Sequence, residues 1–239
     1  SSDVCSSDLV FCSYTGVTAK YIFEKLARIP VEVDLASEFR YRDPILPENT
    51  LVVIVSQSGE TADTLAALRL AKEKGVRTLG IVNVVGSSIA READNVMYTW
   101  AGPEIAVATT KAYSTQLIAQ YLLAMKFAKV RGTVSQNDFD AMIQSLERLP
   151  EQISLLLSHK ENVQRFANRY LAAEHVFFIG RGIDYAISME GSLKLKEISY
   201  IHSEAYAAGE LKHGTISLIE DGRLVVARSE ERRVGKECR

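Results

Sequence analysis

Residues 51–61 read LVVIVSQSGET, and an amphipathic helical stretch follows them over residues 62–74. The apolar β-branched run predicts a buried strand, so the order is strand, hydroxyl-rich turn and helix. This order places unpaired backbone N–H groups and the positive end of a helix in front of an anion. Gly59 lacks a Cβ atom, which lets a ligand approach the backbone closely. The turn carries four further side-chain donors, Ser56, Gln57, Ser58 and Thr61.

The donors of this turn are neutral. The turn contains no lysine and no second glycine at the spacing of a nucleotide P-loop, which excludes that motif. A neutral cradle suits a small phosphomonoester such as a sugar phosphate. The alternative is an ordinary capped helix start, because Ser and Thr cap many helices.

The composition is that of a soluble globular protein. The chain has 239 residues, 47% of them apolar and 24% charged, with a net charge of −2, so it forms one large or two ordinary domains. This balance gives no electrostatic reason to expect nucleic acid or a membrane as partner. No apolar run reaches the roughly 18 residues of a membrane span, and we expect no secretory signal. Three cysteines without metal-site spacing favour a reducing cytoplasm and no metal.

Short β-branched runs alternate with amphipathic runs along most of the chain. The predicted strands cover residues 31–35, 51–55, 77–84, 175–179 and 224–227. The predicted helices cover residues 19–27, 62–74, 106–130, 136–149, 151–170 and 187–198. Such alternation predicts an α/β fold with a parallel sheet covered on both faces. Ligands of these sheets bind beyond the carboxyl ends of the strands, where the 56–61 turn lies.

The chain has an internal repeat, interrupted by a helical connector over residues 131–172 that breaks at Pro150. Residues 34–39 resemble residues 206–211, and each segment follows an apolar strand, a turn and a helix, which start at residues 10–11 in one copy and 176–177 in the other. We interpret this as two copies of one α/β lobe; a chance match of short segments is the alternative. About 55 residues follow the start of the second copy, whereas a whole layer needs roughly 110–130. We therefore expect the second lobe to be truncated.

A second candidate site lies in residues 193–214, LKLKEISYIHSEAYAAGELKHG. Lys194 and Glu197 are three residues apart and share a helix face. They form either a surface ion pair or a carboxylate base whose cation tunes it and holds an anionic substrate. His213 precedes a glycine in a predicted loop, where it is either structural or an acid or base near neutral pH. The opening of the helix at residues 107–111 offers further N–H groups.

Three segments together carry a resemblance to a known family. SQSGETADT at 56–64, GPEIAVATTKAY at 102–113 and the 193–214 segment resemble the isomerising glutamine–fructose-6-phosphate aminotransferases, or glucosamine-6-phosphate synthases. The similarity runs over residues 18–227. It implies tandem SIS domains, each a flavodoxin-like parallel sheet between helices. The expected division is a tail (1–9), a first SIS domain (10–130), the connector (131–172), a partial second SIS domain (173–228) and a tail (229–239).

The resemblance also implies roles for individual residues. The phosphate of the sugar would lie on the side chains of Ser56, Gln57, Ser58 and Thr61. The backbone of Val107 would contact the sugar. Glu197 would move a proton between C1 and C2 during ketose–aldose isomerisation, beside Lys194. His213 would assist ring opening from the partner subunit of a homodimer. This chemistry needs a base, an acid and donors, but no cofactor.

Three departures from the family pattern lead us to expect a fragment. The glutaminase domain and the carboxyl-terminal tail with its Schiff-base lysine are missing, and the phosphate loop of the first lobe is altered at residues 12–16. The parent enzyme makes glucosamine 6-phosphate from fructose 6-phosphate and glutamine; we expect this chain alone to be inactive as a synthase. Both terminal tails read as foreign sequence. The alternatives are a non-catalytic sugar-phosphate-binding SIS module and a stand-alone isomerase.

Overall fold

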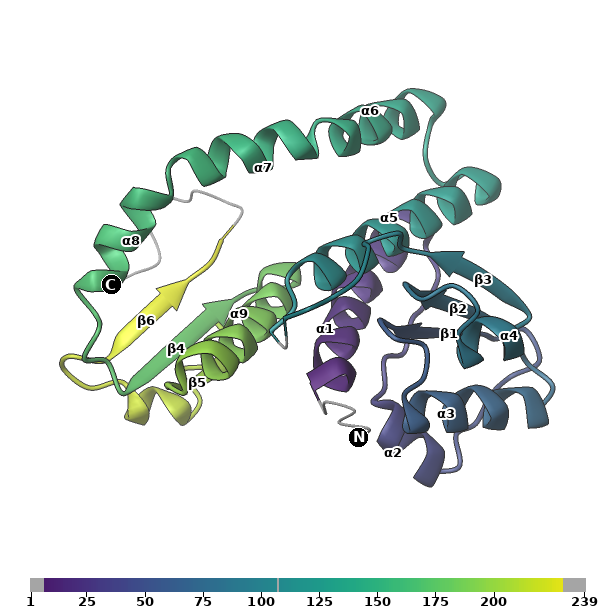
Figure 1. Cartoon of the computed structure of the whole chain (residues 1–239), viewed down its shortest axis with the longest axis horizontal. Helices are drawn as coiled ribbons and strands as arrows, with labels where there is room; N and C mark the ends of the chain where they lie inside the picture. Colours follow the sequence, from purple (N-terminus) through teal and green to yellow (C-terminus); the bar gives the residue numbers. More distant parts are fainter. Residues whose placement is uncertain (1–6, 107, 230–239) are drawn as a thin grey trace. The chain divides into compact units, whose positions relative to one another are not determined.

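The computed structural model describes residues 7–106 and 108–229. The chain divides into two compact units, Ser1–Phe139 and Asp140–Arg239. Each unit contains its own three-stranded parallel sheet and helices that pack on it (Figure 1). The predicted α/β fold class with parallel sheets is therefore confirmed.

The sheet of the first unit has the order β1-β2-β3, with bounds Leu51–Ser56, Arg77–Val82 and Asn95–Tyr98. Helix α3 (Ala62–Glu73) connects β1 to β2 and helix α4 (Ser88–Glu92) connects β2 to β3, as parallel strands require a crossover connection. Leu68 of α3 and Ile89 of α4 are fully buried against Val82 and form the centre of the core. Continuous burial from Thr78 to Val82 means that both faces of β2 are covered.

A pair of long helices completes the first unit. Helix α1 (Ser7–Ile22) continues into the π-helix η1 (Phe23–Ala27) and packs along α5 (Lys111–Arg131). Two buried glutamines of α5 reach α1: the Gln116 amide lies 3.4 Å from the sulfur of Cys12, and the Gln120 amide donates to Thr15 over 2.8 Å. The predicted helix over 19–27 is therefore the end of a longer one.

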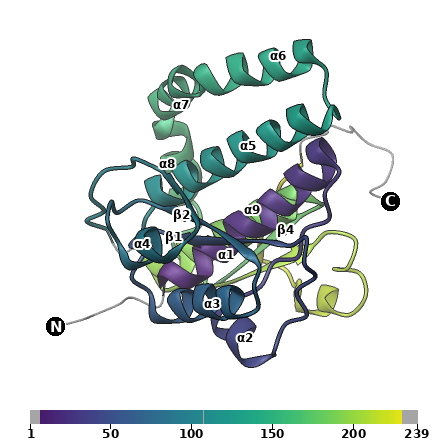
Figure 2. The ribbon, with the colours of Figure 1, turned by 90° about the vertical axis from the view of Figure 1, so that its right-hand side faces the viewer.

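The prediction of a strand over residues 31–35 is wrong. This run forms no regular element and is not part of the sheet, and α2 (Ala36–Tyr41) follows it and lies beside α3 (Figure 2). A strand requires a neighbour for its backbone hydrogen bonds, and the described pairings of β1 are all with β2. The apolar pair at 10–11, which we expected to start the lobe as a strand, belongs to α1 instead.

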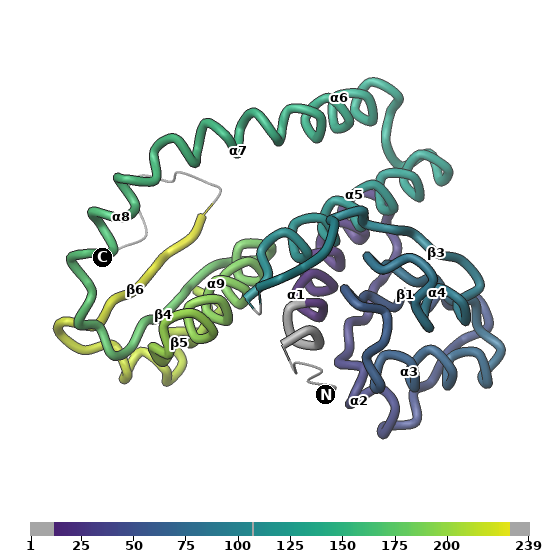
Figure 3. The backbone as a smooth tube through the Cα atoms, in the orientation of Figure 1, coloured from purple at the N-terminus to yellow at the C-terminus, as the bar shows by residue number. Residues whose placement is uncertain are grey.

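The connector consists of three helices in succession, α6 (Gln136–Glu147), α7 (Leu149–Ser158) and α8 (Lys160–Asn168), which Figure 3 traces as a bent tube. We expected two helices with a break at Pro150. The break lies before the proline, at Arg148, because a proline is tolerated in the first turn of a helix and Pro150 stands there. A second break at His159 was not predicted.

The sheet of the second unit has the order β5-β4-β6, with bounds His202–Ala207, His175–Gly180 and Leu224–Ala227. Helix α9 (Ile183–Ser199) joins β4 to β5 and packs on both strands, and a short 3-10 helix, η2 (Thr215–Leu218), precedes β6. The strands predicted at 175–179 and 224–227 are confirmed. Strand β5 was missed because its sequence, HSEAYA, alternates larger polar or aromatic side chains with small ones rather than forming an apolar run.

Candidate functional site

The 56–61 turn joins the carboxyl end of β1 to the first residue of α3, as its sequence predicts. The hydroxyls of Ser56 and Thr61 lie 3.4 Å apart, and both residues are less than 5% exposed. The Ser56 hydroxyl also accepts the N–H of Gly59 over 3.0 Å, and the Ser58 hydroxyl accepts the N–H of Glu60 over 3.2 Å. The side chains of the turn thus shape the turn itself.

The turn is not an ordinary capped helix start. Thr61 occupies the N-cap position of α3, but its side chain makes no capping hydrogen bond. The first N–H groups of any helix lack partners within the helix, and here the Thr61 hydroxyl does not cap them. Gln57 and Ser58 are half-buried at the same edge. The arrangement can therefore present main-chain and hydroxyl donors to an anion, with the positive end of a twelve-residue helix behind them.

Gly59 is required for the path of this turn. Its φ of +70° lies in the left-handed region that disfavours side chains. A Cβ atom at this position would stand 2.2 Å from the hydroxyl oxygen of Ser87 and 2.6 Å from its Cβ. Both the conformation and the close packing of the next loop thus exclude a larger residue here.

The segment before α5 is organised around Glu104. Its carboxylate accepts the N–H groups of Ile105 and Ala106 over 3.0 and 3.2 Å and the hydroxyl of the buried Thr109. The hydrogen bond from Thr109 is the main cause that holds the pKa of Glu104 below its usual range. Val107, the predicted sugar contact, lies outside the described residues.

Lys194 is the centre of the candidate site in the second unit. Its ammonium group donates to a carboxylate oxygen of Glu197 over 2.6 Å and lies 3.5 Å from a carboxylate oxygen of Glu190. All three side chains are on α9 and no more than 15% exposed. The interpretation of Lys194 and Glu197 as an exposed surface ion pair is therefore wrong, because the pair is largely removed from water.

Glu190 was missed by the sequence prediction. Burial raises its pKa to about 7, although the positive charge of Lys194 opposes the shift. Both oxygens of Glu190 and one of Glu197 are buried without a hydrogen-bond partner. The spacing of four residues between Glu190 and Lys194 was the signal available in the sequence, since such residues share a helix face. The cluster thus combines an acid that titrates near neutral pH with a carboxylate beside a fixed cation.

His213 lies in the exposed turn that follows β5, where its main-chain N–H donates to the main-chain carbonyl of Glu210 over 2.9 Å. The structure therefore brings together Ser56 and Thr61 in the first unit and Lys194 and Glu197 in the second. Among the described residues, no group of three His, Cys, Asp or Glu side chains is arranged to hold a metal ion. In the same part of the chain, no helix is long and apolar enough to cross a membrane.

The two α/β units, each with its own parallel sheet, belong to the class of open α/β folds, and the comparison with known families identifies the family within it. Residues 13–126 and 170–235 match the SIS domain, so the chain belongs to the SIS domain family. Within it, the chain is 62% identical over 214 residues to the glutamine–fructose-6-phosphate aminotransferase [isomerizing] of Caldanaerobacter subterraneus subsp. tengcongensis, covering 90% of this chain and 35% of the relative. The resemblance read from the sequence is confirmed.

Two further proteins show the same likeness. The enzyme of the same name from Clostridium acetobutylicum is 60% identical over 214 residues, with 90% of this chain and 35% of the relative covered. The solved C-terminal domain of glucosamine-fructose-6-phosphate aminotransferase from Francisella tularensis superposes with a TM-score of 0.90 at 40% identity. That match covers 95% of this chain and 64% of the solved one. The chain thus spans about a third of the length of these curated relatives.

Proposed function

We propose that this chain is the sugar-phosphate-binding and isomerising part of a glutamine–fructose-6-phosphate aminotransferase. The longer protein would make glucosamine 6-phosphate from fructose 6-phosphate and glutamine. The observation that carries the proposal is the turn between β1 and α3, where Ser56 and Thr61 are buried side by side and the start of α3 is uncapped. This turn offers neutral, oriented donors that match a phosphate ester.

In this proposal, the phosphate group binds at the 56–61 turn. The hydroxyls of Ser56, Ser58 and Thr61, the amide of Gln57 and the first N–H groups of α3 donate to its oxygens. The backbone of Val107 contacts the sugar. Each donor is neutral, so the bound dianion is stabilised by hydrogen bonds and the helix dipole rather than by an ion pair.

The isomerisation is assigned to the second unit. Glu197 takes a proton from one of the two adjacent carbons C1 and C2 and returns it to the other, while His213 supplies a proton to the ring oxygen during ring opening. The ammonium of Lys194, 2.6 Å from Glu197, holds the carboxylate of this base in place and offsets the negative charge of the reacting sugar. These steps require only acids, bases and hydrogen-bond donors.

The remaining features of the proposal concern organisation. Residues 10–130 and 173–228 form the SIS domains, residues 131–172 connect them, and the protein works in the cytoplasm as a homodimer whose partner supplies His213. High identity to enzymes of sugar-phosphate metabolism supports these assignments. Sedimentation of the purified chain over a concentration series tests the dimer, since a species that stays at 26.5 kDa would contradict it.

Calorimetry with fructose 6-phosphate and glucosamine 6-phosphate tests the phosphate site. The Ser56→Ala/Thr61→Ala variant should bind at least about tenfold more weakly, because two hydrogen bonds to a charged group are lost. Ser145→Ala, on the exposed face of α6, is the matched control and should bind as wild type does. Fructose without phosphate should bind neither protein. Unchanged affinity in the double variant would contradict the assignment.

Deuterium exchange tests the chemistry. In D₂O, a chain with a working base should introduce deuterium at C1 of fructose 6-phosphate, which NMR detects. Glu197→Gln should abolish this exchange without preventing binding, whereas Glu161→Gln on the exposed surface of α8 should not change it. Binding without exchange in the wild type would instead support the non-catalytic SIS module.

A further inference from the structure

The turn between β1 and α3 is hydrogen-bonded to the segment that joins β2 to α4 and to the start of α4 itself. The N–H of Asn83 donates to the carbonyl of Gln57 over 3.1 Å. The N–H of Ile89 donates to the carbonyl of Gly59 over 3.0 Å. These bonds join main chain to main chain, so they fix the path of the turn whatever side chains it carries.

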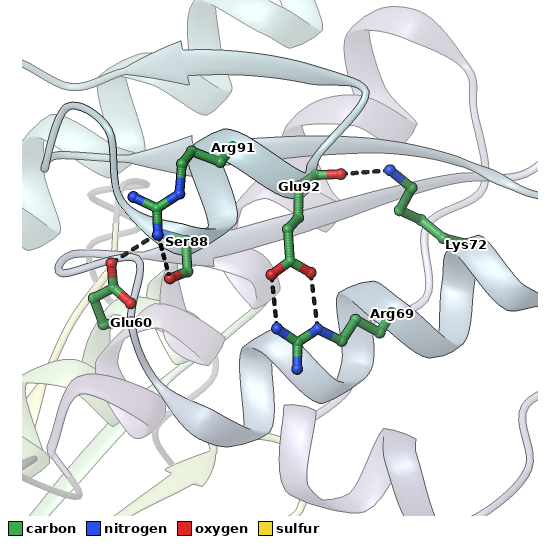
Figure 4. Close-up of polar contacts among 6 residues, drawn as sticks. All are labelled: Glu60, Arg69, Lys72, Ser88, Arg91 and Glu92. Atoms are coloured by element: carbon green, nitrogen blue, oxygen red, sulfur yellow. Dashed lines mark hydrogen bonds and ion pairs between the residues drawn. The ribbon is translucent and has the colours of Figure 1, made fainter.

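Glu60 adds a third attachment through its side chain. Its carboxylate accepts the N–H of Ser88, the first residue of α4, over 2.7 Å (Figure 4). Ser87 is the N-cap residue of α4, but its own side chain makes no capping bond. A residue 28 positions away in sequence thus caps this helix. The hydrogen bonds from Ser88, helped by the charge of Arg91, hold the pKa of Glu60 below its usual range.

Helix α4 is anchored on its other side to α3. The guanidinium of Arg69 makes two hydrogen bonds to the carboxylate of Glu92, over 2.8 and 2.7 Å, and the ammonium of Lys72 donates to the Glu92 carbonyl over 2.5 Å (Figure 4). Because α3 begins directly after the turn, these contacts form a closed ring. The turn continues into α3, α3 contacts α4, and α4 contacts the turn again through Glu60.

We propose that Glu60 is a positioning residue, which clamps the 56–61 turn to α4 and so holds its donors in the conformation that binds a phosphate ester. This inference rests on the proposed function of the turn. An anionic side chain in a phosphate-binding turn would repel the ligand if it were free to swing toward it. Its bond to Ser88 directs the charge away, and a turn held in its bound shape loses less entropy on binding.

Comparing Ser88→Pro with Ser88→Ala separates the main-chain bond between Ser88 and Glu60 from the effect of losing the Ser88 side chain. Proline removes the N–H that Glu60 accepts, yet it suits the first position of a helix, and Ser87 already has the extended ψ of 163° that precedes a proline. Alanine keeps the N–H and removes only the hydroxyl. Glu60→Ala removes the acceptor from the other side, and Glu60→Gln keeps a neutral oxygen in its place.

Glucosamine 6-phosphate binding by calorimetry is the readout, with hydrogen exchange of β2 as a check that the unit is folded. We expect Ser88→Pro and Glu60→Ala each to weaken binding about five- to tenfold. Ser88→Ala keeps the N–H bond but loses a hydroxyl that also interacts with the Glu60 carboxylate, so it should weaken binding clearly less than Ser88→Pro. Glu60→Gln should recover most of the loss. The Ser88→Pro/Glu60→Ala double variant should bind no more weakly than either single variant, because both remove the same bond.

The outcomes separate the clamp from the function of the turn. If the wild type binds and Ser88→Pro matches Ser88→Ala, or if the losses in the double variant add fully, the clamp is refuted and the phosphate site stands. If the folded wild type binds no sugar phosphate, the proposed function is refuted and the positioning role of Glu60 with it.

Discussion

Replacing Gly59 by alanine should strongly destabilise the first unit. An alanine at φ +70° costs about 1–2 kcal/mol of backbone strain. Its Cβ atom would also lie 2.2 Å from the hydroxyl oxygen of Ser87, and relieving such an overlap in a packed site costs about 1–3 kcal/mol more. We therefore expect the free energy of unfolding to fall by about 2–5 kcal/mol.

Gly75→Ala is the matched control. Gly75 has nearly the same φ, +75°, but no atom lies within 4 Å of the Cβ position. The strain and the reduced freedom of the unfolded chain are common to both variants, so their difference of about 1–3 kcal/mol measures the overlap alone. Urea-dependent hydrogen exchange of the β2 amides reports unfolding of this unit specifically. Equal destabilisation by the two variants would refute the reasoning, as would a failure of Ser87→Gly to relieve Gly59→Ala.

Three further predictions concern charged groups. In the folded chain the pKa of Glu190 is about 7, whereas its ordinary value is 4.5. Between these two pH values the folded state keeps a proton on Glu190 that the unfolded state has lost. The free energy of unfolding therefore falls as the pH rises through this range, by up to about 3 kcal/mol. Glu190→Gln should remove this fall in urea unfolding at pH 5 and pH 8, and an unchanged pH dependence would count against it. Lys194→Met leaves Glu190 and Glu197 buried without a counter-charge and should cost about 3–5 kcal/mol by thermal unfolding; a loss below about 1 kcal/mol would contradict this. Arg69→Ala removes an exposed ion pair with Glu92 and should lower the free energy of unfolding by less than about 1 kcal/mol in the same assay. A loss above about 2 kcal/mol would contradict this, because it would mean that the pair contributes more than an exposed ion pair does.

The parts of the fold that the sequence predicts are those with a long, uninterrupted pattern. Strand β1 and helix α3 follow an apolar run and a helical period, and both form where expected. The run at 31–35 alternates apolar and acidic side chains, a pattern that fits a half-buried strand, but it lacks a neighbouring strand, which local pattern does not reveal. Strands β3 and β5 were missed because they owe their conformation to pairing with β2 and β4 rather than to an apolar sequence.

Part of the candidate site was predicted from the sequence and part was missed. The 56–61 turn was located because hydroxyls, Gly59 and a helix start are adjacent in sequence. Glu190 was missed because its significance comes from burial, and a glutamate in a helix reads as solvent-exposed until the packing around it is known. The bond between Glu60 and Ser88 joins two loops that only the sheet brings together, so no spacing in the sequence indicates it.

The path of the 56–61 turn is held by main-chain bonds to Asn83 and Ile89, by the hydroxyls of Ser56 and Ser58, and by the carboxylate of Glu60. Such a turn can exchange its outward side chains in evolution without losing its shape. Under the proposed function, a change at Gln57 alters the donors offered to the phosphate group, while Gly59 keeps the path of the turn. A mutagenesis library that aims to alter phosphate binding should therefore vary Gln57 and leave Gly59 untouched.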